Sequence, residues 1–401
     1  MGEIQGAGKA MILRKITLPL VLPAILSDVI LTFSKAIGTF GTINYLGSPV
    51  QYYTLSSQLY MNINSRDTQT GFAMAILMSI IASIAVFVNQ KLIGSRKSYA
   101  TIGGKGGRST LIGLGKVGRP VITAALFVFF AVGIIMPIVI LVMESFMLKE
   151  GIYSLDNFTL HYWIGESNPQ IMEGLPGIFK NDEFINSLFN SLRLTLVNGV
   201  FGTIFGQLLG YITAKGRGRL HGKLVEQLVF IPYLIPSVAF GGIYLSMFSQ
   251  PQQIFGVTLV PALYGTFALL TLVSVVKHLP FAARAGTSNM LQISGELEEA
   301  ATIEGAGFFR RFVKIVFPLS KGGFISGFML IFVSIMKELD LIILIMTPTT
   351  STLPYLAFRY QNGNSPQASD CVAIVMFSIV FLVYAIANLS GKADLAKSMA
   401  G

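Results

Sequence analysis

Residues 299 to 318 read EAATIEGAGFFRRFVKIVFP, and a shortened copy of this segment opens the chain. A shift of 299 positions places seven residues of the first copy on identical residues of the second: Gly6, Ala7, Gly8, Lys15, Ile16, Pro19 and Leu20. This period is far longer than the repeat unit of any solenoid protein. The sequence therefore predicts two related halves, of which the first is incomplete.

The composition of the 401-residue chain indicates a membrane protein. Hydrophobic residues make up 53% of it and charged residues only 12%, and the mean hydropathy is +0.67. A soluble core cannot bury so many apolar side chains. Apolar stretches close to the ~20 residues that a membrane-spanning helix needs cover residues 20–43, 70–90, 120–143, 186–213, 225–248, 258–279, 320–346 and 370–389. We therefore expect an all-α integral membrane protein, a bundle of about eight transmembrane helices.

Basic residues indicate which ends of these spans face the cytoplasm, because Lys and Arg near span ends are retained on that side. The loops 91–119 and 214–224 carry basic residues and no acidic ones, whereas 144–185 carries seven acidic residues against two basic ones. This contrast predicts that both termini and both copies of the repeat lie on the cytoplasmic face. Topology and anionic lipid explain the net charge of +10, so no nucleic-acid partner is expected.

The chain divides into three parts. Residues 1–90 hold two apolar stretches, residues 91–119 form a linker rich in glycine and basic residues, and residues 120–401 hold six apolar stretches. Glycine-rich linkers are flexible. We expect the linker to be cytoplasmic and to join the two halves.

Small residues and prolines predict how individual spans pack and bend. Glycines recur at four-residue spacing from Gly202 to Gly210, which favours close approach of a neighbouring helix. Pro232 and Pro236 are expected to interrupt the fifth stretch, and Pro280 to end the sixth. Such breaks are tolerated within a bundle because neighbouring helices satisfy the freed backbone groups.

The region 281–318 is amphipathic and charged, and too polar to cross a membrane, so we expect it on the cytoplasmic surface. Ser294 is a candidate helix cap, followed by acidic residues and then by alanine. Gly305 is expected to break this helix, and residues 308–317 to form a second helix that Pro318 closes. The result is a helix, a turn and a helix lying across the base of the bundle.

The spacing of this region resembles the cytoplasmic loop of the permease subunits of binding-protein-dependent ABC importers: Glu-Ala-Ala, three residues, Gly, nine residues, Ile, two residues, Pro. The second copy meets every fixed position with Glu299, Ala300, Ala301, Gly305, Ile315 and Pro318. The first copy keeps Gly6, Ile16 and Pro19, but its acidic position falls before Met1. The resemblance implies a type I, MetI-like permease fold.

The resemblance covers essentially the whole chain. Residues 34–49 resemble the span after the first-half loop in fused permeases of the ferric-iron type, and residues 336–357 resemble the corresponding second-half region. Such permeases have two halves of about six spans each. We therefore expect 1–90 to be the C-terminal remnant of a first half and 120–401 a complete second half, in a permease of the bacterial inner membrane that lacks roughly four N-terminal spans.

The resemblance also implies partners. In the family this cytoplasmic loop, the coupling loop, sits in a groove of a separate ABC ATPase subunit, and closure of that subunit on ATP moves the bundle between inward- and outward-open states. Glu299 is then a polar anchor to the ATPase, and Gly305 is the turn that lets the loop enter the groove. A soluble extracytoplasmic substrate-binding protein is the second implied partner, and the lipid bilayer surrounds the spans.

The chain itself is not expected to be an enzyme. Residues 103–110 are rich in glycine but lack the G-x-x-x-x-G-K-[ST] spacing of a phosphate-binding loop. His161, His221 and His278 are scattered, one outside the cell and two inside, without the spacing of a metal site. We therefore expect no cofactor and no metal, and ATP hydrolysis in another chain.

Ionisable residues inside spans are candidates for the translocation path, because desolvating a charge at the bilayer centre costs at least ~2.5 kcal/mol. The candidates are Asp28 and Lys35 in the first stretch and Lys337, Glu338 and Asp340 in the seventh. The repeat places Lys35 on Ser334 and Thr39 on Glu338. Two alternatives stay open. In one, Lys35 or Lys337 pairs with a carboxylate only to fix helix packing; in the other, Glu338 and Asp340 lie near the outer mouth.

The transported substrate is not determined by these residues. For fused permeases of this kind the resemblance favours ferric iron, and importers of polyamine, thiamine, phosphonate and sugar phosphate have related subunits. An ion-coupled secondary transporter with inverted repeats would also contain charged, broken helices. Against it, both copies of the repeat lie on one side of the membrane in the predicted topology.

Overall fold

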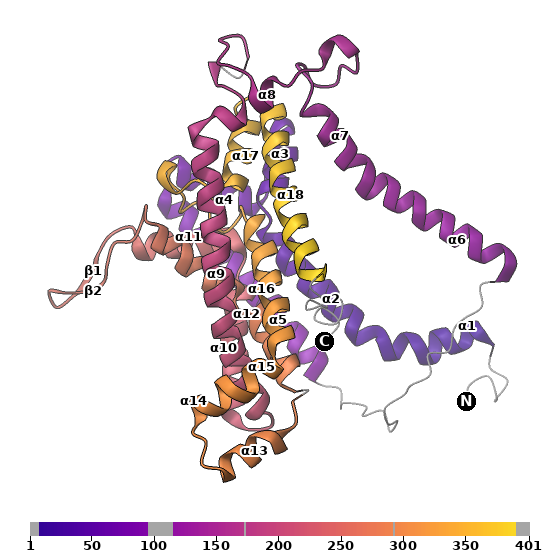
Figure 1. Ribbon diagram of the computed structural model, residues 1–401, viewed down its shortest axis with the longest axis vertical. Coiled ribbons are helices and arrows are strands. Elements are labelled where there is room, and N and C mark those ends of the chain that lie inside the picture. Colours follow the sequence, from indigo (N-terminus) through magenta and orange to yellow (C-terminus); the bar gives the residue numbers. More distant parts are fainter. Residues whose placement is uncertain (1–7, 95–114, 172–173, 292, 390–401) are drawn as a thin grey trace.

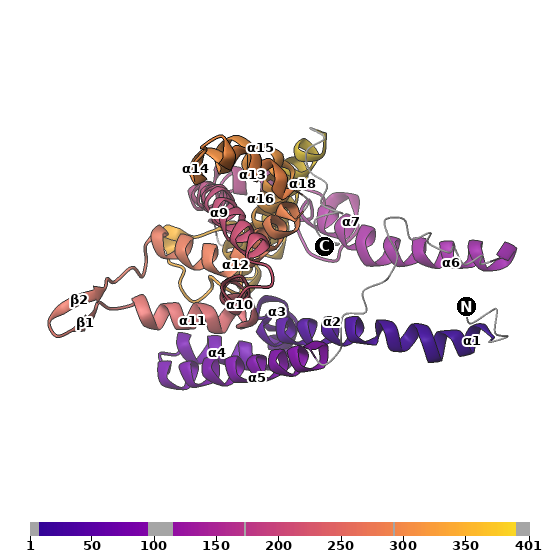
Figure 2. The same ribbon diagram turned by 90° about the horizontal axis from the view of Figure 1, so that it is seen from below.

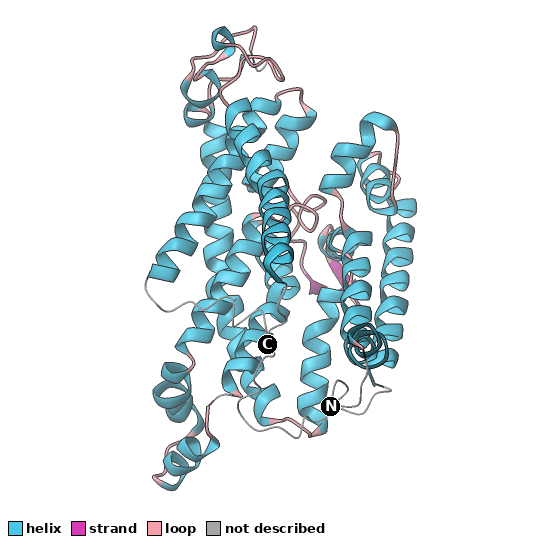
Figure 3. Cartoon of the chain, turned by 90° about the vertical axis from the view of Figure 1, so that its right-hand side faces the viewer, coloured by secondary structure: helices cyan, strands magenta, loops and turns pink. Residues whose placement is uncertain are grey.

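The computed structural model describes residues 8–94, 115–171, 174–291 and 293–389. Helices dominate this part of the chain (Figure 1), and Figure 3 shows them in two groups side by side. Five helices are long and apolar enough to span a membrane, and two bent helix pairs raise that number to seven within the described ranges. The predicted all-α membrane fold is confirmed.

The first group is formed by the N-terminal helices. In the view from below, this group forms a layer beside α11 (Figure 2). Helix α2 occupies the first predicted stretch, and α5 occupies the second. The helices are α1 (Lys9–Ile12), α2 (Leu18–Gly38), α3 (Gly41–Gly47), α4 (Leu55–Asn64) and α5 (Thr68–Gly94).

A long helical arm and an outer cap follow. Helices α6 (Gly115–Phe130) and α7 (Met136–Glu144) join through a π-helical turn and slant away from the bundle (Figure 1). The predicted linker 91–119 is therefore helical at both ends, and its middle lies outside the described residues. Above the bundle, α8 (His161–Ile164) places Trp163 against Phe146, with 5.6 Å between their ring centres. In the loop 144–185, Trp163 and Tyr162 are thus packed, whereas Tyr153 and Phe158 are exposed.

The second group is the main bundle. Its longest member, α9 (Asp182–Lys215), packs along α12 (Phe267–Met290) and α16 (Lys321–Met336). The glycine stripe makes this contact, as predicted: a Cβ atom on Gly206 would lie 2.3 Å from the Cβ of Ala282. The remaining helices of this part of the chain are α10 (Leu220–Leu234), α11 (Ser237–Phe248), α13 (Gly295–Ile303), α14 (Phe308–Arg311), α15 (Phe317–Leu319), α17 (Leu353–Asn362) and α18 (Pro366–Leu389). Of these, α11 packs mainly against α5 of the first group.

The fifth stretch is broken as the prolines predict. Helices α10 and α11 meet at an angle of 97°. Pro232 lies near the end of α10, and Pro236 is the residue that precedes α11. Proline lacks a backbone N–H, so a continuous helical ladder cannot run through this pair.

The prediction for the sixth stretch was wrong in position. Its beginning is not helical but forms β2 (Val257–Val260), which pairs with β1 (Gln252–Ile254) in an antiparallel hairpin. The hairpin turns at Phe255 and Gly256, both with positive φ, the geometry of a tight two-residue turn. The span itself is α12, and Pro280 lies inside it instead of ending it. Hydropathy counts apolar side chains in the hairpin and in the helix alike, and so cannot locate their boundary.

The seventh stretch is also shorter than predicted. Helix α16 ends at Met336, and residues 337–346 form turns, of which residues 341–346 are buried. The side chain of Glu338 accepts a hydrogen bond from the backbone N–H of Leu341 at 2.9 Å. That bond stabilises a turn where the apolar sequence alone suggested a continued helix.

Apolar contacts hold the two groups together. Phe40 is fully buried, with its ring 5.6 Å from that of Phe358 in α17. Around it, Leu59 and Met78 of the first group pack with Val238 of α11. This interface between the groups is a continuous hydrophobic core.

The internal repeat extends to secondary structure. A π-helical turn follows α1 at Leu13–Thr17, and another follows α14 at Phe312–Val316, again 299 positions later. Each turn leads directly to a proline that cannot donate to the helical ladder, Pro19 or Pro318. Farther on, α4 and α17 have the same length and correspond at a shift of 298 positions, and so do the starts of α5 and α18.

Candidate functional site

A pair of equivalent residues from the two copies of the repeat are in direct contact. The backbone N–H of Gly41 donates a hydrogen bond to Oδ1 of Asp340 at 2.9 Å. These two residues are 299 positions apart, so they are equivalent in the repeat. Equivalent residues contact one another only near the axis that relates two copies. That axis therefore passes between the start of α3 and the turns after α16.

A cavity of about 280 Å³ lies at this axis. Its walls come from α2, from the break between α10 and α11, from α12 and from the end of α16. Three pairs of wall residues are related by the repeat: Lys35 with Ser334, Gly38 with Lys337, and Thr39 with Glu338. The lining residues are Lys35, Gly38, Thr39, Tyr233, Ile235, Pro236, Ser237, Lys277, His278, Phe281, Ser334, Lys337, Glu338 and Asp340.

The cavity brings together four of the five residues predicted for the translocation path. Lys35 comes from α2, and Lys337, Glu338 and Asp340 come from the turns after α16. Asp28 lies two helical turns before Lys35, is exposed, and is not part of the lining.

The two carboxylates of the cavity are occupied by the protein itself. Asp340 accepts from Gly41, as described above. Glu338 accepts from the backbone at Leu341 through Oε1, and its Oε2 lies 3.5 Å from Nε2 of His278. Each carboxylate therefore has a fixed partner at the axis.

The lysines of the cavity have no carboxylate partner. The Lys35 ammonium lies 5.3 Å from the centre of the Tyr233 ring, and Lys337 is exposed. Within the described ranges, neither lysine takes part in an ion pair. The alternative in which a lysine–carboxylate pair fixes the packing of these spans is thus not what the structure contains.

Two wall residues were missed by sequence reasoning. Lys277 donates hydrogen bonds to the carbonyl of Pro232, at 2.9 Å, and to that of Ile235. These carbonyls lie at the break between α10 and α11, so one ammonium caps both. His278, beside it, is buried in α12, which corrects the expectation that it lies inside the cell. The signal was available, because two adjacent ionisable residues inside an apolar helix are a functional-site hypothesis.

The predicted coupling loop projects from the base of the bundle (Figure 1). Its first residues belong to α12, so the projection starts after Met290. Ser294 caps α13 by accepting from the backbone N–H of Glu296 at 3.3 Å. Gly305 has a φ of +78°, which favours glycine, and α14 follows. The predicted sequence of helix, turn and helix is confirmed, with the second helix ending at Leu319 just after Pro318.

The motif residues of the loop are mostly on its surface. Glu299, Ala300, Gly305 and Pro318 are exposed, and Ala301 and Ile315 are half-buried. In the first copy, Pro19 lies in the first turn of α2, and Gly6 lies outside the described residues.

A residue beside the predicted anchor attaches the loop to the bundle. Glu298 is buried and forms an ion pair with Lys215 at 2.6 Å, and its other oxygen accepts from the Tyr211 hydroxyl at 2.7 Å. The rings of Phe308 and Phe312 each lie 5.7 Å from the Tyr211 ring. Both helices of the loop are therefore fixed to the end of α9, which the sequence motif alone did not predict.

The loop is connected directly to the cavity. Helix α12 carries Lys277 and His278 in the cavity wall and ends at Met290, about 20 Å farther along at 1.5 Å per residue. After the loop, α16 returns to the cavity at Ser334. Both helices that flank the loop thus form part of the cavity wall.

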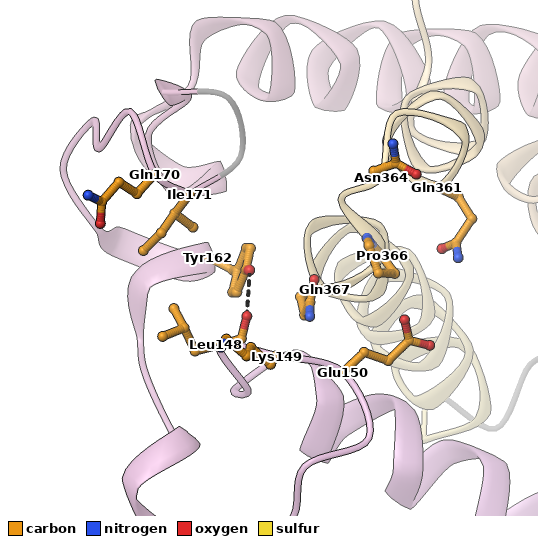
Figure 4. A pocket seen from close by; sticks show the side chains of 10 residues that line it. All are labelled: Leu148, Lys149, Glu150, Tyr162, Gln170, Ile171, Gln361, Asn364, Pro366 and Gln367. Atoms are coloured by element: carbon orange, nitrogen blue, oxygen red, sulfur yellow. Dashed lines mark hydrogen bonds between the residues drawn. The ribbon is translucent and has the colours of Figure 1, made fainter.

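A second pocket, of about 730 Å³, lies at the end of the bundle opposite the coupling loop. Figure 4 shows the outer loop on one side and the segment joining α17 to α18 on the other. On the loop side, the Tyr162 hydroxyl donates to the carbonyl of Leu148 at 3.1 Å. Gln361, Asn364 and Gln367 contribute amide groups on the other side. Polar amide groups and apolar side chains thus line this pocket together.

Comparison with known proteins identifies related sequences. The family model described as "Binding-protein-dependent transport system inner membrane component" matches residues 1–99 and 202–393. The ferric transport system permease protein FbpB of Actinobacillus pleuropneumoniae is 22% identical over 394 residues, covering 96% of this chain and 53% of that protein. The chain thus spans about half the length of this relative.

Other relatives are named as permeases for other substrates. The molybdate/tungstate transport system permease protein WtpB of Thermococcus kodakarensis is 28% identical over 203 residues, covering 50% of this chain and 76% of that protein. The sulfate transport system permease protein CysT of Escherichia coli is 24% identical over 241 residues, covering 58% and 80% respectively.

A solved structure shares the fold. A chain of a bacterial ABC transporter involved in the import of alginate superposes with a TM-score of 0.53 at 16% identity, covering 67% of this chain and 94% of that one.

Proposed function

Because the chain belongs to the family of binding-protein-dependent transport system inner membrane components, we propose that it is a transmembrane permease subunit of an ATP-driven importer. One observation carries the proposal: the projecting loop is inserted between α12 and α16, and both helices form the wall of the cavity at the repeat axis. A force applied to the loop is therefore transmitted along two helices to the cavity.

The loop is built to transmit such a force. Glu298 and the aromatic cluster around Tyr211 attach it to α9, so that it moves as a unit with the bundle. Arg311 closes its turn by donating to the Thr302 hydroxyl at 2.7 Å and to the carbonyl of Ala306 at 3.2 Å. Glu299 stays exposed and available to a partner. In this proposal ATP binds to a separate ATPase subunit that takes the loop in its groove, and the chain itself hydrolyses nothing.

The two groups of helices are assigned to two permease halves. We assign residues 1–90 to a first half and 120–401 to a second half, joined by a cytoplasmic linker at 91–119, with both termini on the cytoplasmic face. The equivalent helices of the two groups, such as α5 and α18, support this division. The end of the bundle that holds the second pocket is then the side that meets a soluble substrate-binding protein. A related solved transporter is described in complex with a substrate-bound periplasmic protein.

Ferric iron is the substrate that we propose first. A relative that matches nearly the whole chain is named as a ferric transport permease, whereas the molybdate/tungstate and sulfate relatives match about half of it. Importers of polyamine, thiamine, phosphonate and sugar phosphate are the broader alternatives.

Reconstitution tests the transport mechanism. The chain is placed in vesicles with the ATPase subunit and the binding protein that co-purify with it, and uptake of the binding protein's ligand is measured. We expect uptake to require ATP and both partners, because the loop transmits motion from outside the chain. Uptake driven by an ion gradient without ATP would instead identify a secondary transporter.

A further inference from the structure

In the cavity at the repeat axis, two lysines form no ion pair within the described chain, whereas the carboxylates are hydrogen-bonded to the protein. Asp340 and Glu338 each accept a backbone hydrogen bond from the surrounding turns. Their lone pairs are therefore partly used inside the protein. Lys35 and Lys337 line the same space, and no carboxylate of the described chain pairs with either of them.

A third lysine lies in the same wall. Lys277 is buried and donates to two main-chain carbonyls, which orient it toward the break between α10 and α11. Ser237 and Ser334 add hydroxyl groups to the wall. Ammonium and hydroxyl groups are hydrogen-bond donors, and donors of this kind bind the oxygens of anions.

The same wall is a poor site for a bare metal ion. Fe³⁺ is a hard cation that needs several oxygen ligands. The carboxylates of Asp340 and Glu338 already accept backbone hydrogen bonds. Lys35 and Lys337, unpaired within the described ranges, repel a cation. The described part of the chain contains no group of three or more His, Cys, Asp or Glu residues that could hold a metal ion. The size of the cavity, about 280 Å³, is near the lower end of the ~300–1,000 Å³ of small-molecule sites, which fits a compact cargo.

Resting on the proposed function, we propose that the cargo occupies this cavity as a compact anion rich in oxygen, held by Lys35 and Lys337. This chemistry has two sources. One is a free tetrahedral oxyanion, and the other is ferric iron enclosed in an anionic chelate whose carboxylates face outward. In both cases the lysines contact oxygen atoms of the cargo, and Asp340 keeps its role at the axis without touching it.

Equilibrium binding to the full purified chain in lipid nanodiscs tests the proposal. The probes are radiolabelled molybdate, radiolabelled ferric citrate and gadolinium(III), a soluble hard trivalent cation. We expect one of the two anions to bind and gadolinium not to compete with it. The anion that binds identifies the source. Gadolinium binding that displaces both anions would overturn the proposal, and so would the absence of binding by either anion.

Charge-changing variants of opposite sign sharpen the test. K35Q and K337Q are each expected to weaken anion binding several-fold and the double variant about tenfold or more, because each removes a charged donor. D340N keeps an oxygen for Gly41 and removes a negative charge, so it should bind the anion as tightly or more tightly. The matched control is K223Q, which removes one exposed positive charge on α10 away from the cavity. If D340N instead weakened ligand binding and the lysine variants left it unchanged, the site would be a cation site and the proposal would fail.

The wild-type chain provides a readout that does not depend on variants. Raising the salt from about 20 mM to about 200 mM is expected to weaken anion binding, because salt screens the lysines. Association of the ATPase subunit with the loop is measured on the same sample. If the ATPase associates but no anion binds, the importer proposal stands and the inference about the cargo fails.

Discussion

Two adjacent glutamates of the loop have different environments because successive helical residues point about 100° apart. Glu298 faces α9 and is buried in contact with Lys215 and Tyr211. Glu299 faces solvent. One carboxylate therefore attaches the loop to its own bundle, and the other is free for a second protein.

Replacing Glu299 with Ala should weaken association of the ATPase subunit about tenfold and lower uptake, because a charged contact across the interface is lost. Folding and membrane insertion should be unchanged, since the side chain is exposed. A pull-down with the ATPase subunit measures association, and an uptake assay measures transport. The control is Glu226→Ala, which removes an exposed carboxylate from α10. Normal association in Glu299→Ala would remove this residue from the coupling role.

Replacing Glu298 with Ala should loosen the loop instead. The change leaves Lys215 without its partner and costs roughly 1–2 kcal/mol, less than for a fully buried pair, because the Lys215 side chain is 36% exposed. Hydrogen exchange of residues 295–319 measures the effect, and their amides should exchange faster. Glu299→Ala is the matched comparison and should leave exchange of the free chain unchanged. Equal exchange in the two variants would contradict the assigned roles.

At the scale of elements, α9 and α12 approach each other so closely at Gly206 and Gly210 that neither position has room for a side chain. A close helix contact at Gly206 and Gly210 was predicted from their spacing alone. The structure shows why glycine is needed there: a Cβ on Gly210 would lie 2.5 Å from the backbone nitrogen of Thr287. This part of the fold follows from sequence because small residues at four-residue spacing have few other uses in a membrane helix.

The variant Gly206→Val should destabilise the bundle by roughly 1–3 kcal/mol or more, because the added atoms overlap Ala282 and force the helices apart. Thermal unfolding in detergent, followed by the loss of monodisperse protein, measures it. Gly133→Ala is the control, since a Cβ at that position meets no atom within 4 Å. An unchanged melting temperature in Gly206→Val would contradict the prediction, because it would show that the helices accommodate the larger side chain without loss of stability.

The elements that sequence reasoning misplaced share one cause. Hydropathy measures side chains, but the hairpin before α12 and the turns after α16 are decided by backbone hydrogen bonds and positive φ. Pro280 was expected to end a span because proline lacks a backbone N–H. In the fold, the carbonyls at the α10–α11 break satisfy Lys277, and the helix continues.

At the scale of the whole molecule, the cavity depends on four segments far apart in the chain. The repeat period related Lys35 to Ser334 from sequence, because it relates the two copies directly. It could not relate either of them to Tyr233 or Lys277, since no pattern in one sequence connects α10 and α12 to α2. The coupling loop was predictable for the opposite reason, because all its motif residues lie in one short segment.

The contact between the two groups should depend on Phe40. Replacing it with Ala removes a fully buried ring that lies 4.5 Å from Tyr60 and 5.6 Å from Phe358, centre to centre. The expected cost is about 3–5 kcal/mol, measured as a fall in the melting temperature of the whole chain. Phe33→Ala on α2 is the control, because that ring is 51% exposed. Equal effects of the two changes would show that the groups are not joined through this core.

The hydrogen bond between positions 41 and 340 has a consequence for the symmetry of the molecule. In a symmetric dimer of identical chains, a residue on the axis faces its own copy, so an aspartate there would set two carboxylates against each other and one would have to give up its charge. Two copies within one chain can differ at this position. Here one copy has a glycine whose N–H points at the axis, and the other places a carboxylate opposite it.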